Sequence, residues 1–159
     1  MSLTMEPVCY TLEGALEKAI ENEQHSIRIY RHALKVVKDQ QTRMMLKEVG
    51  LEELEHKHTL EKALFDETIA LHEKEEATGP SMNLTEILHE KPLSDKSTPQ
   101  DVMIFAIHDE RRTVEFYKQM ANQCSGAPME TVFSKLQKHE MIHLTRLEEA
   151  YEKHYMAHM

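Results

Sequence analysis

An internal repeat constrains this sequence more than any other feature. Residues 19–63 reappear, imperfectly and without a gap, as residues 106–150, at a constant offset of 87 residues. The identical pairs include Ala19 and Ala106, Ile20 and Ile107, Glu23 and Glu110, Tyr30 and Tyr117, Glu53 and Glu140, His56 and His143, Leu60 and Leu147, and Ala63 and Ala150. A repeat of this length indicates two copies of one supersecondary unit.

The repeated blocks have the apolar spacing of helices. Apolar residues recur every three or four positions, and the 159 residues include only four Gly and five Pro. Joints rich in polar residues or in Gly and Pro fall at 39–42, 77–97 and 125–128. We therefore expect four long helices between these joints. Their expected bounds are about 11–38, 43–76, 98–124 and 129–155.

The lengths of the joints predict how the helices pair. The first and last joints are short, so we expect two antiparallel helical hairpins, at about 11–76 and 98–155. A helix of ~25 residues is ~38 Å long, and ~12 extended residues cover that height. The connection at about 77–97 is therefore long enough to cross from one end to the other. We predict an all-α four-helix bundle over residues 11–155, preceded by an N-terminal segment at 1–10.

The third helix carries a clear start signal. Thr98 is a good N-cap residue, Pro99 suits the first helical position, and Asp101 places a negative charge in the first turn. Within the crossover, residues 84–89 are expected to form one short helical turn.

Composition and charge exclude several classes of function. The chain has 19 Lys and Arg against 28 Asp and Glu, a formal charge of −9, which argues against a nucleic-acid partner. No apolar run reaches the ~18–20 residues of a membrane span, and the first residues lack the features of a secretory signal. Two cysteines are too few for a four-thiolate metal site. We expect a cytoplasmic protein that binds neither nucleic acid nor membrane.

Six of the repeated residues are polar groups that lie on apolar stripes. They are Glu23, Glu53, His56, Glu110, Glu140 and His143. An unpaired buried carboxylate costs several kcal/mol, so four of them in one core must be neutralised by protons or by cations. Two divalent cations would cancel the four negative charges. Glu and His three residues apart lie on one helix face and can reach one ion.

The repeat also separates these residues from chance pairs. The sequence contains four Glu-x-x-His pairs, but only Glu53/His56 and Glu140/His143 correspond at the offset of 87. The other two pairs, Glu55/His58 and Glu86/His89, are predicted to be surface residues. One Glu from each of two helices, plus a Glu-x-x-His from each of the other two, is the dimetal-carboxylate arrangement of helical bundles. The alternative is a degenerate duplicated bundle whose Glu side chains face solvent.

Two tyrosines and one histidine stand close to these six residues. Tyr30 and Tyr117 follow Glu23 and Glu110 by seven residues and share their helix faces. We predict that they donate hydrogen bonds next to the metal layer; the alternative is a pair of core tyrosines with satisfied hydroxyls. His139 adjoins Glu140 and is the one other histidine of interest.

Three segments of the sequence resemble the rubrerythrin family within the ferritin-like superfamily. They are AIENEQHSIRIYRHAL, AIHDERRTVEFYKQMA and FSKLQKHEMIHLTRLEEAYEKHY, and the resemblance covers about residues 11–155. It implies a ferritin-like bundle that holds two iron ions on the six Glu and His residues named above. It also implies a homodimer that reduces hydrogen peroxide or handles dioxygen.

The sequence departs from the rubrerythrin pattern in two ways. It has no Cys-x-x-Cys motif, whereas rubrerythrins carry an iron–tetracysteine domain, so we expect an external electron donor such as a rubredoxin-type protein. Rubrerythrins also have an extra carboxylate three residues after the first ligand of the third helix, where this chain has Thr113. A ferritin cage usually has a further short helix after the fourth, for which we expect no room here.

The ligand types and the resemblance together favour redox chemistry. Carboxylate oxygens with imidazole suit iron, with manganese or zinc as substitutes. We expect Glu53 and Glu140 to bridge two metals, Glu23 and Glu110 to be terminal, and His56 and His143 each to bind one metal. The leading hypothesis is a non-haem di-iron oxidoreductase. The alternatives are an iron-binding or storage protein with ferroxidase activity and a metal-free helical interaction module.

Overall fold

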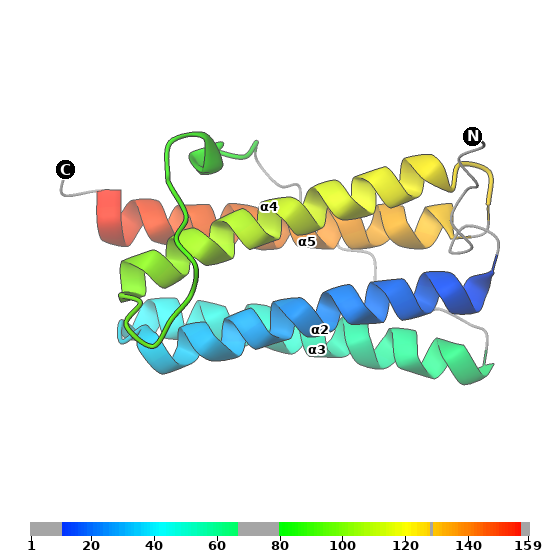
Figure 1. Ribbon diagram of the computed structural model, residues 1–159, viewed down its shortest axis with the longest axis horizontal. Helices are drawn as coiled ribbons and strands as arrows, with labels where there is room; N and C mark the ends of the chain where they lie inside the picture. The colour runs from blue at the N-terminus through cyan, green and yellow to red at the C-terminus, as the bar shows by residue number, and fades with distance from the viewer. Residues whose placement is uncertain (1–10, 67–79, 128, 157–159) are drawn as a thin grey trace.

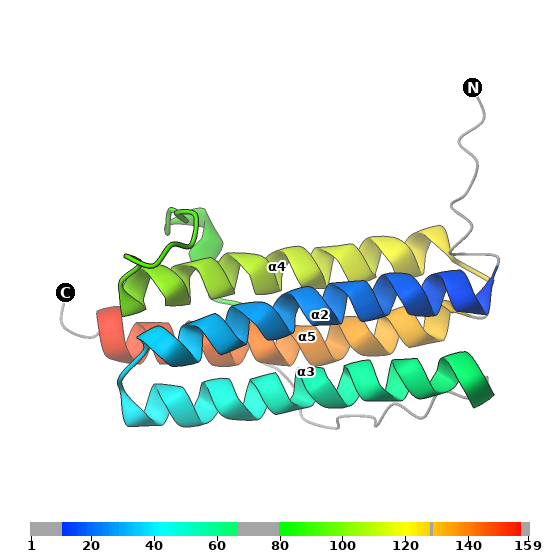
Figure 2. The same cartoon turned by 60° about the horizontal axis from the view of Figure 1, so that its bottom comes forward.

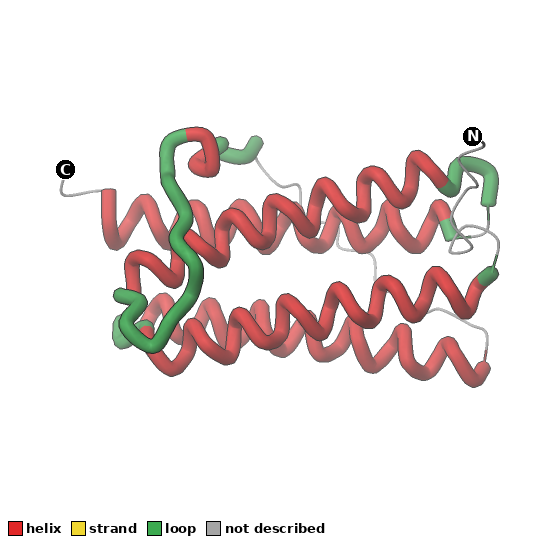
Figure 3. The backbone as a smooth tube through the Cα atoms, viewed as in Figure 1, coloured by secondary structure: helices red, strands yellow, loops and turns green. Residues whose placement is uncertain are grey.

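Four long helices form an elongated bundle in the computed structural model, which describes residues 11–66, 80–127 and 129–156 (Figure 1). They are α2 (Leu12–Val36), α3 (Gln40–Asp66), α4 (Pro99–Gln123) and α5 (Glu130–Tyr151). A short 3-10 turn, η1 (Leu84–Glu86), lies in the crossover, and a π-helical segment, η2 (Glu152–Met156), extends α5. The described residues contain no strand (Figure 3).

The helices pair as two antiparallel hairpins. α2 packs on α3, α4 packs on α5, and α2 adjoins α4 across the bundle (Figures 1 and 2). The described part of α3 ends at the opposite end of the bundle from the start of α4, as a long crossover requires. The predicted all-α, ferritin-like bundle is thus confirmed. The expected end of the second helix near residue 76, the crossover residues 77–79 and the N-terminal segment 1–10 lie outside the described residues.

Short polar side chains cap the first turns of α3 and α4. The Thr98 hydroxyl accepts a hydrogen bond from the Asp101 amide, and the Asp101 carboxylate accepts one from the Thr98 amide, which confirms the predicted cap. The expected joint at 39–42 is shorter in the structure, because Asp39 caps the next helix. Its carboxylate accepts hydrogen bonds from the amide and the hydroxyl of Thr42, both at 2.8 Å. The residues after Asp39 are therefore already helical.

The core has two apolar clusters separated by a polar layer. One cluster packs around Leu16, Leu60, Tyr117, Phe133 and Leu136. The other packs around Tyr30, Leu46, Met103, Leu144 and Leu147. Between the two clusters the helices bury Glu and His side chains. None of the described helices is both long enough and apolar enough to span a bilayer.

A buried carboxylate on α5 holds the crossover in place. Glu148 is fully buried, and it accepts hydrogen bonds from the Ser81 hydroxyl at 2.8 Å and from the Leu84 amide at 3.1 Å. Arg111 also donates to the Ser81 hydroxyl. The repeat equivalent of Glu148 is Glu61, which is exposed. The crossover therefore gives the second hairpin a contact that the first hairpin does not share.

Replacing Glu148 should loosen this attachment. Glu148→Ala leaves the buried Leu84 amide without its acceptor, and an unsatisfied buried donor costs about 1–3 kcal/mol. We expect the free energy of unfolding, measured by urea denaturation followed by circular dichroism, to fall by about that amount. Glu149→Ala, at the exposed neighbouring position, is the control. Equal stabilities of the two variants would contradict the role assigned to Glu148.

Candidate metal centre

The polar layer brings the six predicted side chains together at the middle of the bundle. Glu23 comes from α2, Glu110 from α4, and one Glu-x-x-His pair comes from each of α3 and α5. They form two groups, each with its ligand atoms within 4.8 Å of one another: Glu23, Glu53, His56 and Glu140, and then Glu53, Glu110, Glu140 and His143. All six residues are buried. We call them the carboxylate cluster.

Both imidazoles present the same nitrogen to the carboxylates. Nδ1 of His143 lies 2.6 Å from Glu53 Oε1 and 3.2 Å from Glu140 Oε2. Nδ1 of His56 lies 3.6 Å from Glu23 Oε1 and 3.5 Å from Glu140 Oε1. Glu53 and Glu140 belong to both groups. Their positions would therefore allow each of them to contact two ions.

The atoms that face one another in the cluster are poorly satisfied by the protein itself. Nine buried side-chain polar atoms have no well-oriented hydrogen-bond partner in the described part of the chain, and six of them belong to the carboxylate cluster. These six are Glu23 Oε2, both oxygens of Glu53, His56 Nδ1, Glu110 Oε1 and Glu140 Oε1. Buried polar atoms are rarely left in this state. Five carboxylate oxygens and one imidazole nitrogen are a donor set that fits hard or intermediate divalent cations.

Each tyrosine reaches the carboxylate on the other helix. The Tyr30 hydroxyl on α2 donates to Glu110 Oε2 on α4 at 2.5 Å, and the Tyr117 hydroxyl on α4 donates to Glu23 Oε1 on α2 at 3.0 Å. Burial, followed by the nearby carboxylates, raises the pKa of both tyrosines well above the ordinary value of 10.0. Both hydroxyls therefore keep their protons and act as hydrogen-bond donors.

The cluster without cations must be neutralised by protons. Burial lowers the pKa of His56, but the Glu140 and Glu23 carboxylates that face its Nδ1 outweigh this effect and raise the pKa from 6.5 to about 10. Burial and the neighbouring carboxylates raise the pKa values of Glu53 and Glu110 well above 4.5. Cations that bind here must displace these protons, so binding and proton release are linked.

Two residues that sequence analysis did not assign as ligands contact the outer side of the imidazoles. His143 Nε2 lies 2.6 Å from Glu52 Oε2, and His56 Nε2 lies 2.7 Å from His139 Nδ1. Glu52 and His139 occupy equivalent positions in the repeat but differ in type. A search for identical repeated residues therefore passes over both, although each directly precedes a predicted ligand.

A buried hydroxyl, that of Thr113, stands at the position of the extra rubrerythrin carboxylate, and the repeat has a second hydroxyl at the equivalent position. Thr113 on α4 is buried, and its repeat equivalent on α2, Ser26, is fully buried. Each follows a Glu of the cluster by three residues and so lies on the same helix face. Neither hairpin places a further carboxylate at this position.

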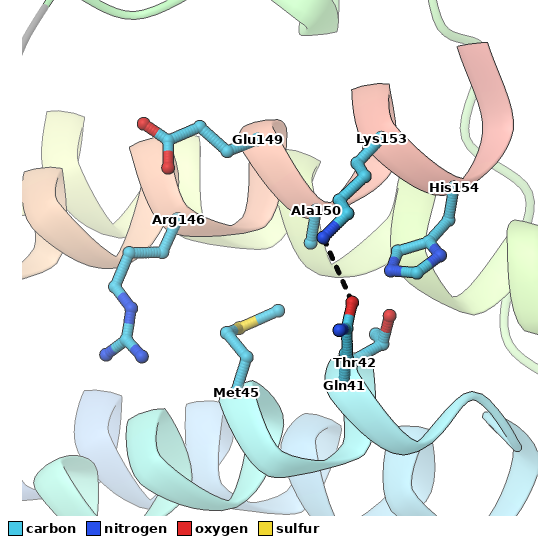
Figure 4. Close-up of a pocket in the computed structure, with 8 residues that line it drawn as sticks. All are labelled: Gln41, Thr42, Met45, Arg146, Glu149, Ala150, Lys153 and His154. Atoms are coloured by element: carbon cyan, nitrogen blue, oxygen red, sulfur yellow. Dashed lines mark hydrogen bonds between the residues drawn. The ribbon is translucent and has the colours of Figure 1, made fainter. Parts of the chain in front are cut away.

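The remaining sequence candidates lie outside the cluster. Glu55, His58, Glu86 and His89 are all exposed, as predicted. A surface pocket of about 220 Å³ lies between the start of α3 and the end of α5, where Lys153 donates to Gln41 at 3.0 Å (Figure 4). None of the predicted ligands lines this pocket. They lie in the interior of the bundle instead.

The raised pKa of His56 predicts how the stability of chelator-treated protein depends on pH. In the folded protein His56 binds its proton more tightly than in the unfolded chain, so this stabilisation is complete below pH 6.5 and is lost as the pH rises to about 10. We therefore expect the melting temperature to decrease as the pH is raised from 6.5 to about 10. At about 1.4 kcal/mol per pKa unit, the loss amounts to a few kcal/mol.

Two variants of α3 test the origin of this loss. His56→Gln should remove much of the pH dependence, whereas His58→Gln, at an exposed position of the same helix, should leave it unchanged. A melting temperature that rises over this range would show that the cluster does not hold its protons as described.

Comparison with known proteins agrees with the geometry. The family model described as Rubrerythrin matches residues 14–151, which include every residue of the carboxylate cluster. No curated protein and no solved structure gives a significant match. Because this match covers most of the chain, the chain belongs to the rubrerythrin family.

Proposed function

We propose that this protein is a non-haem di-iron oxidoreductase that reduces hydrogen peroxide or dioxygen with electrons from an external donor protein. Family membership supports a di-iron protein. The observation that carries the proposal is the pair of overlapping ligand groups that share Glu53 and Glu140 in the bundle interior. Four carboxylates balance two divalent ions, which removes the cost of burying them.

The residues divide into roles according to their positions in the two groups. Glu53 and Glu140 are proposed to bridge two iron ions, and Glu23 and Glu110 to bind one ion each. His56 and His143 would each coordinate one ion through Nδ1, the nitrogen that faces the carboxylates. Manganese or zinc could bind to the same donor set, so the choice of iron as the metal is itself part of the proposal.

The protein itself contributes to the chemistry by orienting the carboxylates and by excluding water from the site. The bound iron pair would supply two electrons for cleavage of an O–O bond. Tyr30 and Tyr117 hold the carboxylates of Glu110 and Glu23 by hydrogen bonds, and burial keeps their hydroxyls protonated. The two apolar clusters exclude water from above and below the polar layer, which strengthens the electrostatic interactions inside it.

Metal content tests the centre directly. Protein loaded with Fe(II) without oxygen should hold two iron ions per chain by elemental analysis. Glu53→Ala and Glu140→Ala each remove a shared residue, so we expect both ions to be lost or weakened together. Glu55→Ala is the matched control, because it changes an exposed Glu two residues away on the same helix. Full metal loading of Glu53→Ala would contradict the bridging role.

The second candidate is an iron-binding protein with ferroxidase activity but no dedicated reductase cycle. The observation that favours it is the buried hydroxyl of Thr113, at the position where rubrerythrins have the extra carboxylate. A cluster without that carboxylate can still oxidise bound Fe(II). The two functions differ in whether the oxidised site is reduced again by a partner.

Turnover separates these two candidates. We expect peroxide to oxidise the Fe(II)-loaded protein in a stopped-flow experiment, and reduced rubredoxin, supplied as a donor, to sustain many turnovers per centre. Oxidation that stops after one turnover with the donor present would favour the ferroxidase. Indifference of the iron-loaded protein to both peroxide and oxygen would remove the redox role altogether.

A groove beside the centre supports a docking place for the donor. It has a volume of about 490 Å³, lies between α2 and α3, and includes Tyr30, which bonds to Glu110. Leu51 and Leu54 are exposed in it, at 65% and 47%. Its charged residues are Arg31, Lys47 and Lys57, all cationic, although the chain carries a formal charge of −9. This combination fits a donor with an acidic surface around an apolar contact.

The same charges argue against a second copy of the chain in this groove. A two-fold interface places each patch against itself, which would bring the three cations of one protomer against those of its partner. The homodimer expected from the family resemblance is therefore proposed to use another surface.

Charge reversal tests the groove. Lys47→Glu/Lys57→Glu should lower the rate at which reduced rubredoxin reduces the oxidised centre, with a weaker salt dependence, because steering of an acidic partner is lost. Oxidation of the iron by peroxide should not change, because neither lysine belongs to the cluster. Lys62→Glu, on an exposed part of α3 outside the groove, is the control. Equal effects of the two charge reversals would reject this docking place.

A further inference from the structure

We infer that Glu52 and His139 make the two metal positions unequal, so that the position of His143 binds a divalent cation more tightly than the position of His56. The inference rests on the proposed metal centre and goes beyond it, because the six repeated ligands alone are equivalent in type. The His143 position is defined by Glu110 and His143, and the His56 position by Glu23 and His56, each with the two shared carboxylates.

The two imidazoles are oriented alike, but their outer partners differ. In both rings Nδ1 faces the carboxylates and Nε2 faces away from them. The partner of His143 Nε2 is a carboxylate oxygen of Glu52, at 2.6 Å, whereas the partner of His56 Nε2 is the ring nitrogen of His139, at 2.7 Å. Both halves of the repeat therefore have a hydrogen bond at the histidine Nε2, but the acceptor is a carboxylate in one half and an imidazole in the other.

The change in chemistry should alter the strength of the metal–nitrogen bond. An imidazole that coordinates through Nδ1 carries its proton on Nε2 and donates it to the outer partner. A carboxylate acceptor withdraws that proton more strongly than a neutral imidazole does, and a stronger acceptor makes the ligand nitrogen more basic. His143 should therefore be the better electron donor to a bound cation.

The surroundings of the two outer partners reinforce the difference. Glu52 is only partly buried, with its side chain 25% exposed, and Arg146 Nη1 lies 3.9 Å from its Oε1, so a cation stands beside this carboxyl group. His139 is 3% exposed and packs against the His56 ring with centroids 4.9 Å apart. The repeat equivalent of Arg146 is Thr59, so the first hairpin does not reproduce this support.

Cobalt titration tests the inference without any measurement of turnover. Co(II) is added to the full chain and followed by calorimetry and by its visible absorption. We expect two steps, with the tighter one on the order of 10- to 100-fold stronger, the usual effect of an outer hydrogen-bond partner. Glu110→Ala should abolish the tighter step, and Glu23→Ala the weaker one. Two sites of equal affinity would overturn the inference and leave the metal centre intact.

Exchange of the two outer partners separates this role from a structural one. Glu52→His/His139→Glu should reverse the order of filling, which a general loss of stability could not do. Glu52→Gln keeps an acceptor oxygen but removes its charge, so it should weaken the tighter step about tenfold even if the exchanged protein does not fold. His139→Gln should change the weaker step less. An unchanged affinity in Glu52→Gln would overturn the inference, and the absence of any cobalt binding would overturn the metal centre as well.

Discussion

The burial of charge at the middle of the bundle is the constraint on which the rest of this structure depends. Four carboxylates and two imidazoles lie between two apolar clusters, out of contact with water. An uncompensated carboxylate in such a core costs several kcal/mol. The fold therefore requires that the charges of this layer be cancelled, by protons or by cations.

The repeat gives this layer an approximate two-fold symmetry that no single helix has. α2 and α4 are antiparallel neighbours, so the seven residues that separate each Glu from its Tyr run in opposite directions on the two helices. Tyr30 therefore meets Glu110, and Tyr117 meets Glu23. One hydrogen-bonded pair lies toward each apolar cluster, and the hydrogen bonds from the two tyrosines to Glu110 and Glu23 link the two hairpins.

The sequence predicted those parts of the molecule that depend on local periodicity or on identity between the repeats. Apolar spacing indicated four helices, Thr98 and Asp101 indicated a cap, and repeated Glu and His residues indicated the cluster. It did not indicate the early start of α3, because Asp39 reads equally well as a joint residue or as a cap. Glu52 lacks an identical counterpart in the repeat, and Glu148 gains its role only from the path of the crossover, which no local pattern encodes.

The described part of the crossover covers one side of the bundle. Segment 80–98 lies against α4 (Figure 1), where His108 Nε2 lies 2.7 Å from the Leu88 carbonyl oxygen, and it covers Glu148 on α5. Within the described residues, the groove on the α2–α3 side is lined only by residues of those two helices. That side keeps exposed leucines and cations beside Tyr30. A duplicated bundle thus acquires two unlike faces from its connectivity, before any difference between the two copies is considered.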